Sequence, residues 1–144
     1  MTLAFAPERI EQWPLARLQP YAKNAKLHGA DQVAKLAASM AEFGWTVPCL
    51  VGEDGELIAG HGRVLAATQL GLTEAPVIVV GHLTEAQRRA YRIADNKLTD
   101  NSDWDDRLLA EQLKDLSLLD LDFSLEDTGF DMGEIDFRIE NLDL

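Results

Sequence analysis

Apolar side chains recur at helical spacing in several parts of the chain. Between residues 31 and 43 they fall three or four positions apart, which places them on one face of an amphipathic helix that ends before Gly44. The side chains on that face are Val33, Leu36, Ala37, Met40 and Phe43. Helix-forming runs and capping signals predict further helices over residues 64–70, 85–96, 105–116 and 132–142.

Short apolar runs between the helices predict strands over residues 13–18, 48–51, 56–59 and 76–80. The turn residues 53–55 join the second and third runs into a hairpin. The fourth run is β-branched and nearly all apolar, so we expect a central buried strand there. This mixture of helices and strands indicates an α/β (α+β) fold.

The hairpin leads into a glycine turn that carries candidate chemistry. Residues 57–59 are followed by Gly60, His61, Gly62 and Arg63, and then by helix-forming residues. Glycines allow a ligand to approach the backbone, and the free N–H groups at the start of a helix attract anions. Arg63 can add charge-assisted hydrogen bonds to a phosphate. A plain strand-to-helix connection, whose glycines only save space, explains the same residues equally well.

A second polar cluster stands at the predicted end of the helix over residues 85–96. Asp95 and Asn96 offer oxygen ligands for a hard cation, and Lys97 can meet a phosphate. Polar residues also end many helices without a function. On these residues alone, that simpler explanation is favoured.

Two clusters of basic residues are further candidates for a binding site. The loop over residues 20–29 carries one of them, namely Lys23, Lys26 and His28. The helix over residues 85–96 carries the other, namely Arg88, Arg89 and Arg92. The loop is more typical of solvated surface than of a site. The arginines indicate an exposed helix face, which either meets nucleic acid or is balanced by Glu85.

Composition and charge limit the classes of protein to which this chain can belong. The chain has 144 residues, 47% of them hydrophobic, and no apolar run long enough to cross a bilayer. Its net charge is −12, yet residues 1–99 carry 10 basic and 10 acidic residues, and residues 100–144 carry 3 and 15. The acidic third is therefore expected to face solvent or a basic partner rather than phosphates.

The single cysteine and the N-terminal sequence indicate a cytoplasmic protein. Cys49 excludes an internal disulfide, and its apolar neighbours indicate a buried side chain rather than a reactive thiolate. The first residues lack the cationic and apolar regions of a signal peptide.

The change in composition predicts two parts. We expect a domain over residues 1–100 and an acidic, mainly helical extension over residues 101–144, packed on or beside it. The extension keeps enough Leu, Phe and Ile to fold, and Ser102 or Asp103 is expected to cap its first helix.

The order of these motifs resembles the ParB N-terminal domain superfamily, also called ParB-like nuclease domains. The resemblance covers residues 13–100 and rests on the glycine-ended helix, the sequence Leu-Ile-Ala-Gly-His-Gly-Arg, a Pro-Val-Ile strand and the Asp-Asn pair. In particular the chain looks like the phage- and plasmid-associated branch, whose members often precede a DNA methyltransferase. The resemblance implies a small mixed sheet with surrounding helices, of the ParB N-terminal and sulfiredoxin-like type.

A nucleotide pocket is what this resemblance implies. In partition proteins of the superfamily, the corresponding turn and a Glu-Asn box hold CTP with Mg²⁺, and binding closes a DNA clamp. Here CTP or ATP would be bound by Gly60, His61, Gly62, Arg63, Lys26, Asn96 and Lys97. Asn96, with Asp95, would orient the Mg²⁺, and the candidates for catalysis are His61 and Asp95.

Three departures from the superfamily pattern are expected to weaken triphosphate binding. The family turn is Gly-Glu-Arg-Arg, and Gly62 here replaces its first arginine. Asp95 is one methylene shorter than the family's glutamate, and Thr99 stands where the second box has an arginine.

These observations predict a nucleotide-binding domain in DNA partition or modification, for which slow hydrolysis would provide a switch. Two alternatives stay open. A DNA-processing nuclease has weaker support, because the basic half offers only Asp95 as a suitably placed carboxylate. A non-catalytic docking module for a DNA methyltransferase would use the acidic extension. Sulfiredoxin chemistry is not expected, since glycine and histidine replace that family's catalytic cysteine. A homodimer is among the expected assemblies.

Overall fold

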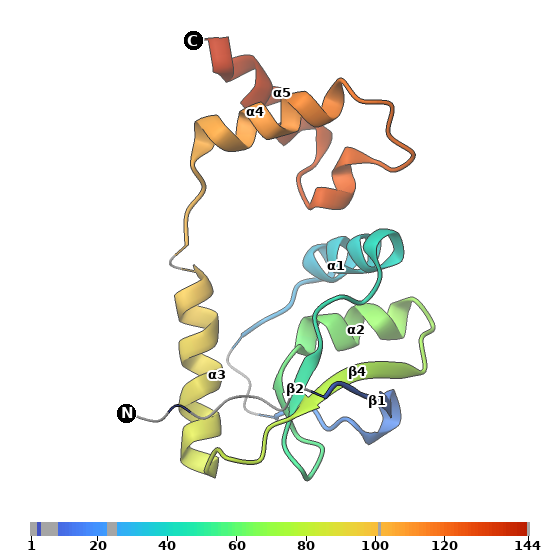
Figure 1. Ribbon diagram of the computed structural model, residues 1–144, viewed down its shortest axis with the longest axis vertical. Helices are drawn as coiled ribbons and strands as arrows, with labels where there is room; N and C mark the ends of the chain where they lie inside the picture. The colour runs from blue at the N-terminus through green and yellow to red at the C-terminus, as the bar shows by residue number, and fades with distance from the viewer. Residues whose placement is uncertain (1–2, 4–8, 23–25, 101, 144) are drawn as a thin grey trace. The chain divides into compact units, whose positions relative to one another are not determined.

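The computed structural model describes residue 3 and residues 9–22, 26–100 and 102–143, so Lys23 of the basic loop lies outside the described residues. The chain divides into two compact units, Met1–Asp100 and Asn101–Leu144 (Figure 1). Within the described ranges, no helix has both the length and the apolar character that a membrane span requires.

The first unit is built on a four-stranded mixed sheet with the order β1-β4-β2-β3. Strand β1 (Glu11–Pro14) runs antiparallel to β4 (Glu74–Val79). Strand β2 (Cys49–Val51) is parallel to β4 and forms an antiparallel hairpin with β3 (Leu57–Ala59). The small mixed sheet, the hairpin and the internal position of the fourth strand are confirmed.

Two helices complete the apolar core of this unit. Helices α1 (Ala30–Phe43) and α2 (His61–Gln69) pack against each other through Val33, Ala37, Met40, Ala66 and Ala67. The sheet contributes a second cluster, into which Val64 of α2 packs: Trp13, Leu18, Cys49, Val51, Leu57, Ala75 and Val77. The alanines of α2 allow the two helices to approach closely. The apolar stripe predicted for α1 is confirmed for Val33, Leu36, Ala37 and Met40, whereas Phe43 is exposed and its place in the stripe is wrong.

Helix α3 (Glu85–Asp100) packs along β3, and Figure 1 shows it apart from the α1–α2 pair. Its start is fixed by a capping box. The Thr84 hydroxyl accepts from the backbone N–H of Gln87 at 3.1 Å, and the Gln87 side chain accepts from the N–H of Thr84 at 2.9 Å. Most side chains of α3 are exposed to solvent.

The second unit is helical. Helices α4 (Asp106–Ser117) and α5 (Met132–Glu140) pack around the buried side chains Ala110, Leu113 and Ile135. Asp105 caps α4 by accepting from the N–H of Leu108 at 3.1 Å, so the prediction of Ser102 or Asp103 as the cap is wrong. This unit also contains short 3₁₀ turns at Leu125–Thr128 and Asn141–Asp143, and the first unit has one at Leu15–Arg17.

Three boundaries differ from the sequence prediction by more than two residues. Residues 15–17 turn away from the predicted strand, because the N–H of Leu15 bonds to Thr73 and the N–H of Leu18 closes a turn on Leu15. Helix α2 begins at His61 rather than at residue 64. Helix α3 continues to Asp100 instead of ending at residue 96. The glycine turn is thus the first turn of α2, and the Asp-Asn-Lys cluster lies inside a helix.

Packing explains both glycines of the turn. Gly60 has φ +106°, and a Cβ there would lie 2.7 Å from Cys49 Sγ. A Cβ at Gly62 would lie 2.9 Å from the Leu36 side chain and 3.0 Å from the His28 ring. The space-saving interpretation therefore accounts for these two residues, whatever the helix start binds.

We expect Gly60→Ala to destabilise the first unit more than Gly71→Ala. Gly71 also has a positive φ, +74°, but open space where a Cβ would go, so it isolates the backbone cost of about 1–2 kcal/mol. The collision with Cys49 should add at least about 1 kcal/mol at Gly60. Urea denaturation of the two variants measures this difference, and equal losses would show that the Cys49 contact relaxes freely.

Candidate anion-binding pocket

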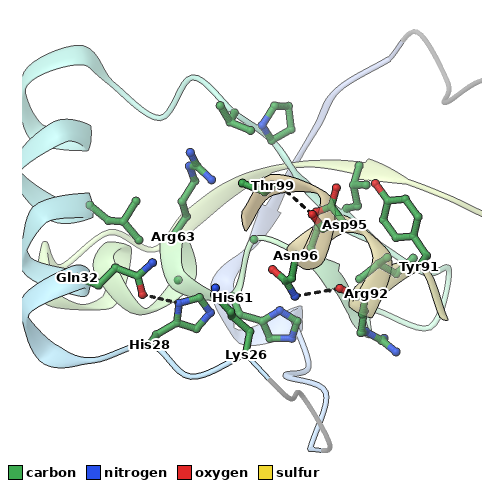
Figure 2. Close-up of a pocket in the computed structure, with 18 of the residues that line it drawn as sticks. Lys26, His28, Gln32, His61, Arg63, Tyr91, Arg92, Asp95, Asn96 and Thr99 are labelled. Atoms are coloured by element: carbon green, nitrogen blue, oxygen red, sulfur yellow. Dashed lines mark hydrogen bonds between the residues drawn. The ribbon is translucent and has the colours of Figure 1, made fainter. Parts of the chain in front are cut away.

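The first unit contains a pocket of about 560 Å³. Its walls are the start of α1, the first turn of α2, one face of α3 and the apolar side chains of β2, β3 and β4 (Figure 2). Among the predicted site residues, the pocket brings together Lys26, Gly60, His61, Gly62, Arg63, Asp95 and Asn96. Lys97 does not line the pocket, because its side chain is exposed on another face of α3.

The first turn of α2 presents backbone donors to the pocket. Within the part of the chain that the structure describes, no side chain caps the N-terminus of α2, and Gly60 precedes this helix in a left-handed conformation. The N–H of Val64 closes the first helical hydrogen bond on Gly60 at 3.0 Å. The N–H groups of the three preceding residues, with the positive end of the helix dipole, favour an anion. Arg63 lines the same pocket and can add a guanidinium.

His61 is held as a neutral hydrogen-bond acceptor. Its Nε2 accepts from the backbone N–H of Tyr21 at 3.4 Å, which leaves the ring proton on Nδ1. Burial lowers the pKa of His61 below 6.5, and the charges of Arg92 and His28 lower it further. The lone pair that a general base would need is engaged with Tyr21, so this geometry suits His61 as a donor.

The loop before α1 closes one side of the pocket. His28 Nδ1 lies 3.0 Å from Gln32 Oε1, and Figure 2 shows both side chains beside the α2 turn. Lys26 Nζ lies 3.2 Å from Asp100 Oδ1, which ties the loop to the last residue of α3. The loop that the sequence assigned to surface therefore contributes to the pocket.

The pocket face of α3 carries residues at helical spacing, namely Arg92, Asp95, Asn96 and Thr99. The Asn96 amide nitrogen donates to the carbonyl of Arg92 at 2.9 Å, which fixes the amide and leaves its oxygen for a ligand (Figure 2). Burial raises the pKa of the Tyr91 hydroxyl, and the charge and hydrogen bonding of Asp95 raise that pKa further.

Arg92 is a pocket residue that the sequence did not reveal. Its side chain is only 4% exposed, so its assignment to an exposed helix face is wrong. Nε and Nη2 donate to the carbonyl of Leu57 at 3.1 and 2.8 Å, and Nη2 also lies 2.8 Å from Glu56 Oε1. The guanidinium carbon lies 3.8 Å from the centre of the Tyr21 ring. Its spacing from Asn96, one helical turn, was the signal available in the sequence.

Arg88 belongs to the hairpin rather than to a nucleic-acid face. Its Nη1 lies 3.2 Å from Asp54 Oδ1 and 3.9 Å from Glu56 Oε1. Two arginines of α3 thus pair with two carboxylates of the β2–β3 turn, which fastens the first half of α3 to the sheet. Arg89 remains exposed, as the sequence predicted.

Cys49 lies beneath the turn and is fully buried. Burial raises the pKa of its thiol to about 11, against the opposing charge of Arg63. The prediction of a buried, unreactive side chain is confirmed.

The polar groups of the pocket divide into two kinds. Lys26, Arg63 and Arg92 are cationic and stand with the α2 helix start, whereas Asp95 and Asn96 offer oxygens. No group of three or more His, Cys, Asp or Glu side chains that could hold a metal occurs within the described ranges. A cation bound here would therefore take further oxygens from the ligand, as Mg²⁺ does with phosphates.

Known proteins match this chain in sequence. The family model of the ParB N-terminal domain matches residues 2–96. The ParB-like nuclease domain-containing protein YnaK of Escherichia coli (strain K12) is 53% identical over 81 residues, which are 56% of this chain and 93% of that protein. The chromosome-partitioning protein Spo0J of Thermus thermophilus is 32% identical over 137 residues, 92% of this chain and 49% of that protein. This chain thus spans about half the length of Spo0J.

Solved structures share the fold. The C-terminally truncated chromosome-partitioning protein ParB from Caulobacter crescentus, complexed with CTP-gamma-S, superimposes with a TM-score of 0.77 at 20% identity, over 94% of this chain and 79% of that one. The Pnob8-like ParB-N domain gives a TM-score of 0.54 at 14% identity, over 80% and 46%. The predicted resemblance and fold are confirmed.

We expect His61 to make stability depend on pH. Its pKa is lowered on folding, so below its ordinary value of 6.5 the unfolded chain binds more protons there than the folded chain. The contribution is complete above that value and is lost as the pH falls through the lowered pKa. Urea denaturation between about pH 7.5 and 5.5 should show a steeper loss in the wild type than in His61→Gln. His82 is an exposed histidine, so His82→Gln should keep the wild-type dependence of unfolding free energy on pH. If the wild type and His61→Gln show the same dependence, His61 is not the group responsible.

Proposed function

This chain belongs to the ParB N-terminal domain family, and we propose that its pocket binds a nucleoside triphosphate, CTP or ATP, together with Mg²⁺. The observation that carries the proposal is the meeting of two kinds of group in one cavity. An uncapped helix start with Arg63 and Lys26 faces a carboxylate–amide pair on α3. A triphosphate with a hard cation satisfies both.

The phosphates would lie at the first turn of α2. The first turn offers three backbone N–H groups and the positive end of the helix dipole, and Arg63 lines the same pocket; each of these favours a multiply charged oxygen ligand. Lys26 reaches the cavity from the loop, where a phosphate would compete with Asp100 for its ammonium. His61 Nδ1–H would add a neutral donor beside them.

The cation would lie between the phosphates and α3. Asn96 has its nitrogen committed to the carbonyl of Arg92, so its oxygen is oriented for coordination without any rearrangement. Asp95 lines the same pocket and would add a carboxylate. One carboxylate, one amide oxygen and the phosphate oxygens make a ligand set that Mg²⁺ commonly accepts. The bound cation would neutralise phosphate charge in the cavity.

We further propose that nucleotide binding acts as a switch in DNA partition or modification in the cytoplasm. The Caulobacter crescentus partition protein with the same fold is a complex with CTP-gamma-S, which favours CTP as the first nucleotide to test. Slow hydrolysis would reset such a switch.

A docking function is the second candidate, and the charge of the second unit favours it. Residues 101–144 carry 14 acidic and 3 basic residues, which repel DNA and suit a basic protein surface. A DNA-processing partner such as a methyltransferase would meet this requirement. The two functions are compatible, because they use different units of the chain.

Calorimetric titration with CTP, ATP, GTP and UTP in Mg²⁺ tests the nucleotide proposal. We expect binding of one nucleotide in the micromolar range, weakened about tenfold or more by Arg63→Ala, which removes a charge-assisted contact. Arg89→Ala is the matched control, since Arg89 is an exposed arginine that does not line the pocket. If none of the four nucleotides binds, the nucleotide proposal is wrong and docking becomes the better-supported function.

The Mg²⁺ dependence of nucleotide affinity should rest on Asn96. We expect the gain in nucleotide affinity from Mg²⁺ over EDTA to be smaller in Asn96→Ala than in the wild type, because one of the two protein oxygen ligands is lost. Lys97→Ala should keep the wild-type response, since Lys97 does not line the pocket. An undiminished response to Mg²⁺ in Asn96→Ala would place the cation elsewhere.

A further inference from the structure

Arg92 brings an unsatisfied donor to the wall of the pocket. Its guanidinium is 4% exposed, and its Nη1 is buried without a hydrogen-bond partner within the described part of the chain. The opposite edge of the same guanidinium is saturated, because Nε and Nη2 both donate to the carbonyl of Leu57. Leaving a buried, charged N–H unpaired is costly, so the position calls for an acceptor.

The surroundings place this donor beside the anion turn. The Tyr21 ring covers the Arg92 guanidinium at 3.8 Å, and the backbone N–H of Tyr21 bonds to His61, the first residue of α2. Arg92 is close enough to His61 to affect its protonation. Arg92 also lines the same cavity as Arg63. Both arginines therefore line one cavity, from different helices, α3 and α2.

We propose that Arg92 is a second phosphate-binding guanidinium of this pocket, whose Nη1 is uncovered on binding and donates to a phosphate oxygen while the other edge stays on Leu57. The inference rests on the proposed function, because it names a further residue of the same nucleotide site. It also adds a cation to a turn in which glycine precedes the single arginine. A guanidinium held by a backbone carbonyl and an aromatic ring is already oriented, so little side-chain entropy is lost on binding.

A purely structural role for Arg92 makes a different prediction, and Glu56 separates the two. Glu56 Oε1 lies 2.8 Å from Arg92 Nη2, and its charge offsets the charge that a phosphate would meet. Glu56→Gln removes this charge and keeps an oxygen acceptor for the guanidinium. If Arg92 binds phosphate, the substitution should strengthen anion binding. If Arg92 only anchors α3, the substitution should loosen the helix and weaken binding.

Asp54→Asn provides the matched control. Asp54 lies on the same hairpin turn and undergoes the same loss of charge, but it pairs with Arg88 at 3.2 Å and does not line the pocket. A rise in affinity that reflects only the lower negative charge of the hairpin would appear equally in both variants. A rise confined to Glu56→Gln would point to the Arg92 guanidinium.

The experiment is calorimetric titration of the full chain with CTP–Mg²⁺ and, separately, with inorganic tripolyphosphate. Urea denaturation of each variant without ligand serves as the folding check. We expect Arg92→Gln to weaken both ligands about tenfold or more, as loss of a hydrogen bond to a charged group does. Arg92→Lys should be intermediate. Glu56→Gln should bind both ligands several-fold more tightly than Asp54→Asn and the wild type.

The outcomes separate this inference from the proposed function. Weaker binding in Glu56→Gln, or equal affinities in Glu56→Gln and Asp54→Asn, would overturn the role of Arg92 even if Arg92→Gln fails to fold. Binding of tripolyphosphate without any nucleotide would refute the proposed function, while the same variants still decide the role of Arg92. A wild type that binds neither ligand would overturn both.

Discussion

The buried guanidinium of Arg92 fixes the geometry on which the pocket depends. Among the residues of α3, all of which the structure describes, Arg92 is the one that is buried, and it is held by the carbonyl of Leu57 in β3. Helix α3 supplies Asp95 and Asn96, and β3 leads into the glycine turn, so this side chain links the two halves of the site. A helix anchored by hydrogen bonds is positioned by their direction rather than by apolar area.

The glycine turn shows how packing and anion affinity arise from the same geometry. Gly60 and Gly62 are required by their neighbours, because a Cβ at either position would collide with Cys49 or with Leu36 and His28. The tight turn that results brings an uncapped helix start against the sheet, where its N–H groups face the cavity. The two interpretations of this stretch are therefore compatible, since a connection selected for compactness also creates an electropositive helix start.

Sequence periodicity predicted the sheet, the hairpin and the helices, because apolar spacing records which side of an element faces the core. Apolar spacing could not predict the burial of Arg92. An arginine counts as polar in any such pattern, and this side chain is buried through its hydrogen bonds to Leu57, 35 residues away in sequence. Lys97 was included because it follows Asn96, yet neighbouring residues of a helix point about 100° apart. The site was predictable where its residues share a turn, and not where a long-range contact decides which side chain turns inward.

The position of Cys49 gives the protein an internal reporter. The thiol is fully buried against Gly60 and has its pKa raised to about 11, so alkylating reagents cannot reach a thiolate while the turn is in place. Labelling of this single cysteine therefore requires local opening of the packing around Gly60, and its rate measures how often that opening occurs. A molecule that occupies the cavity would slow the labelling, so the labelling rate of Cys49 would report ligand binding.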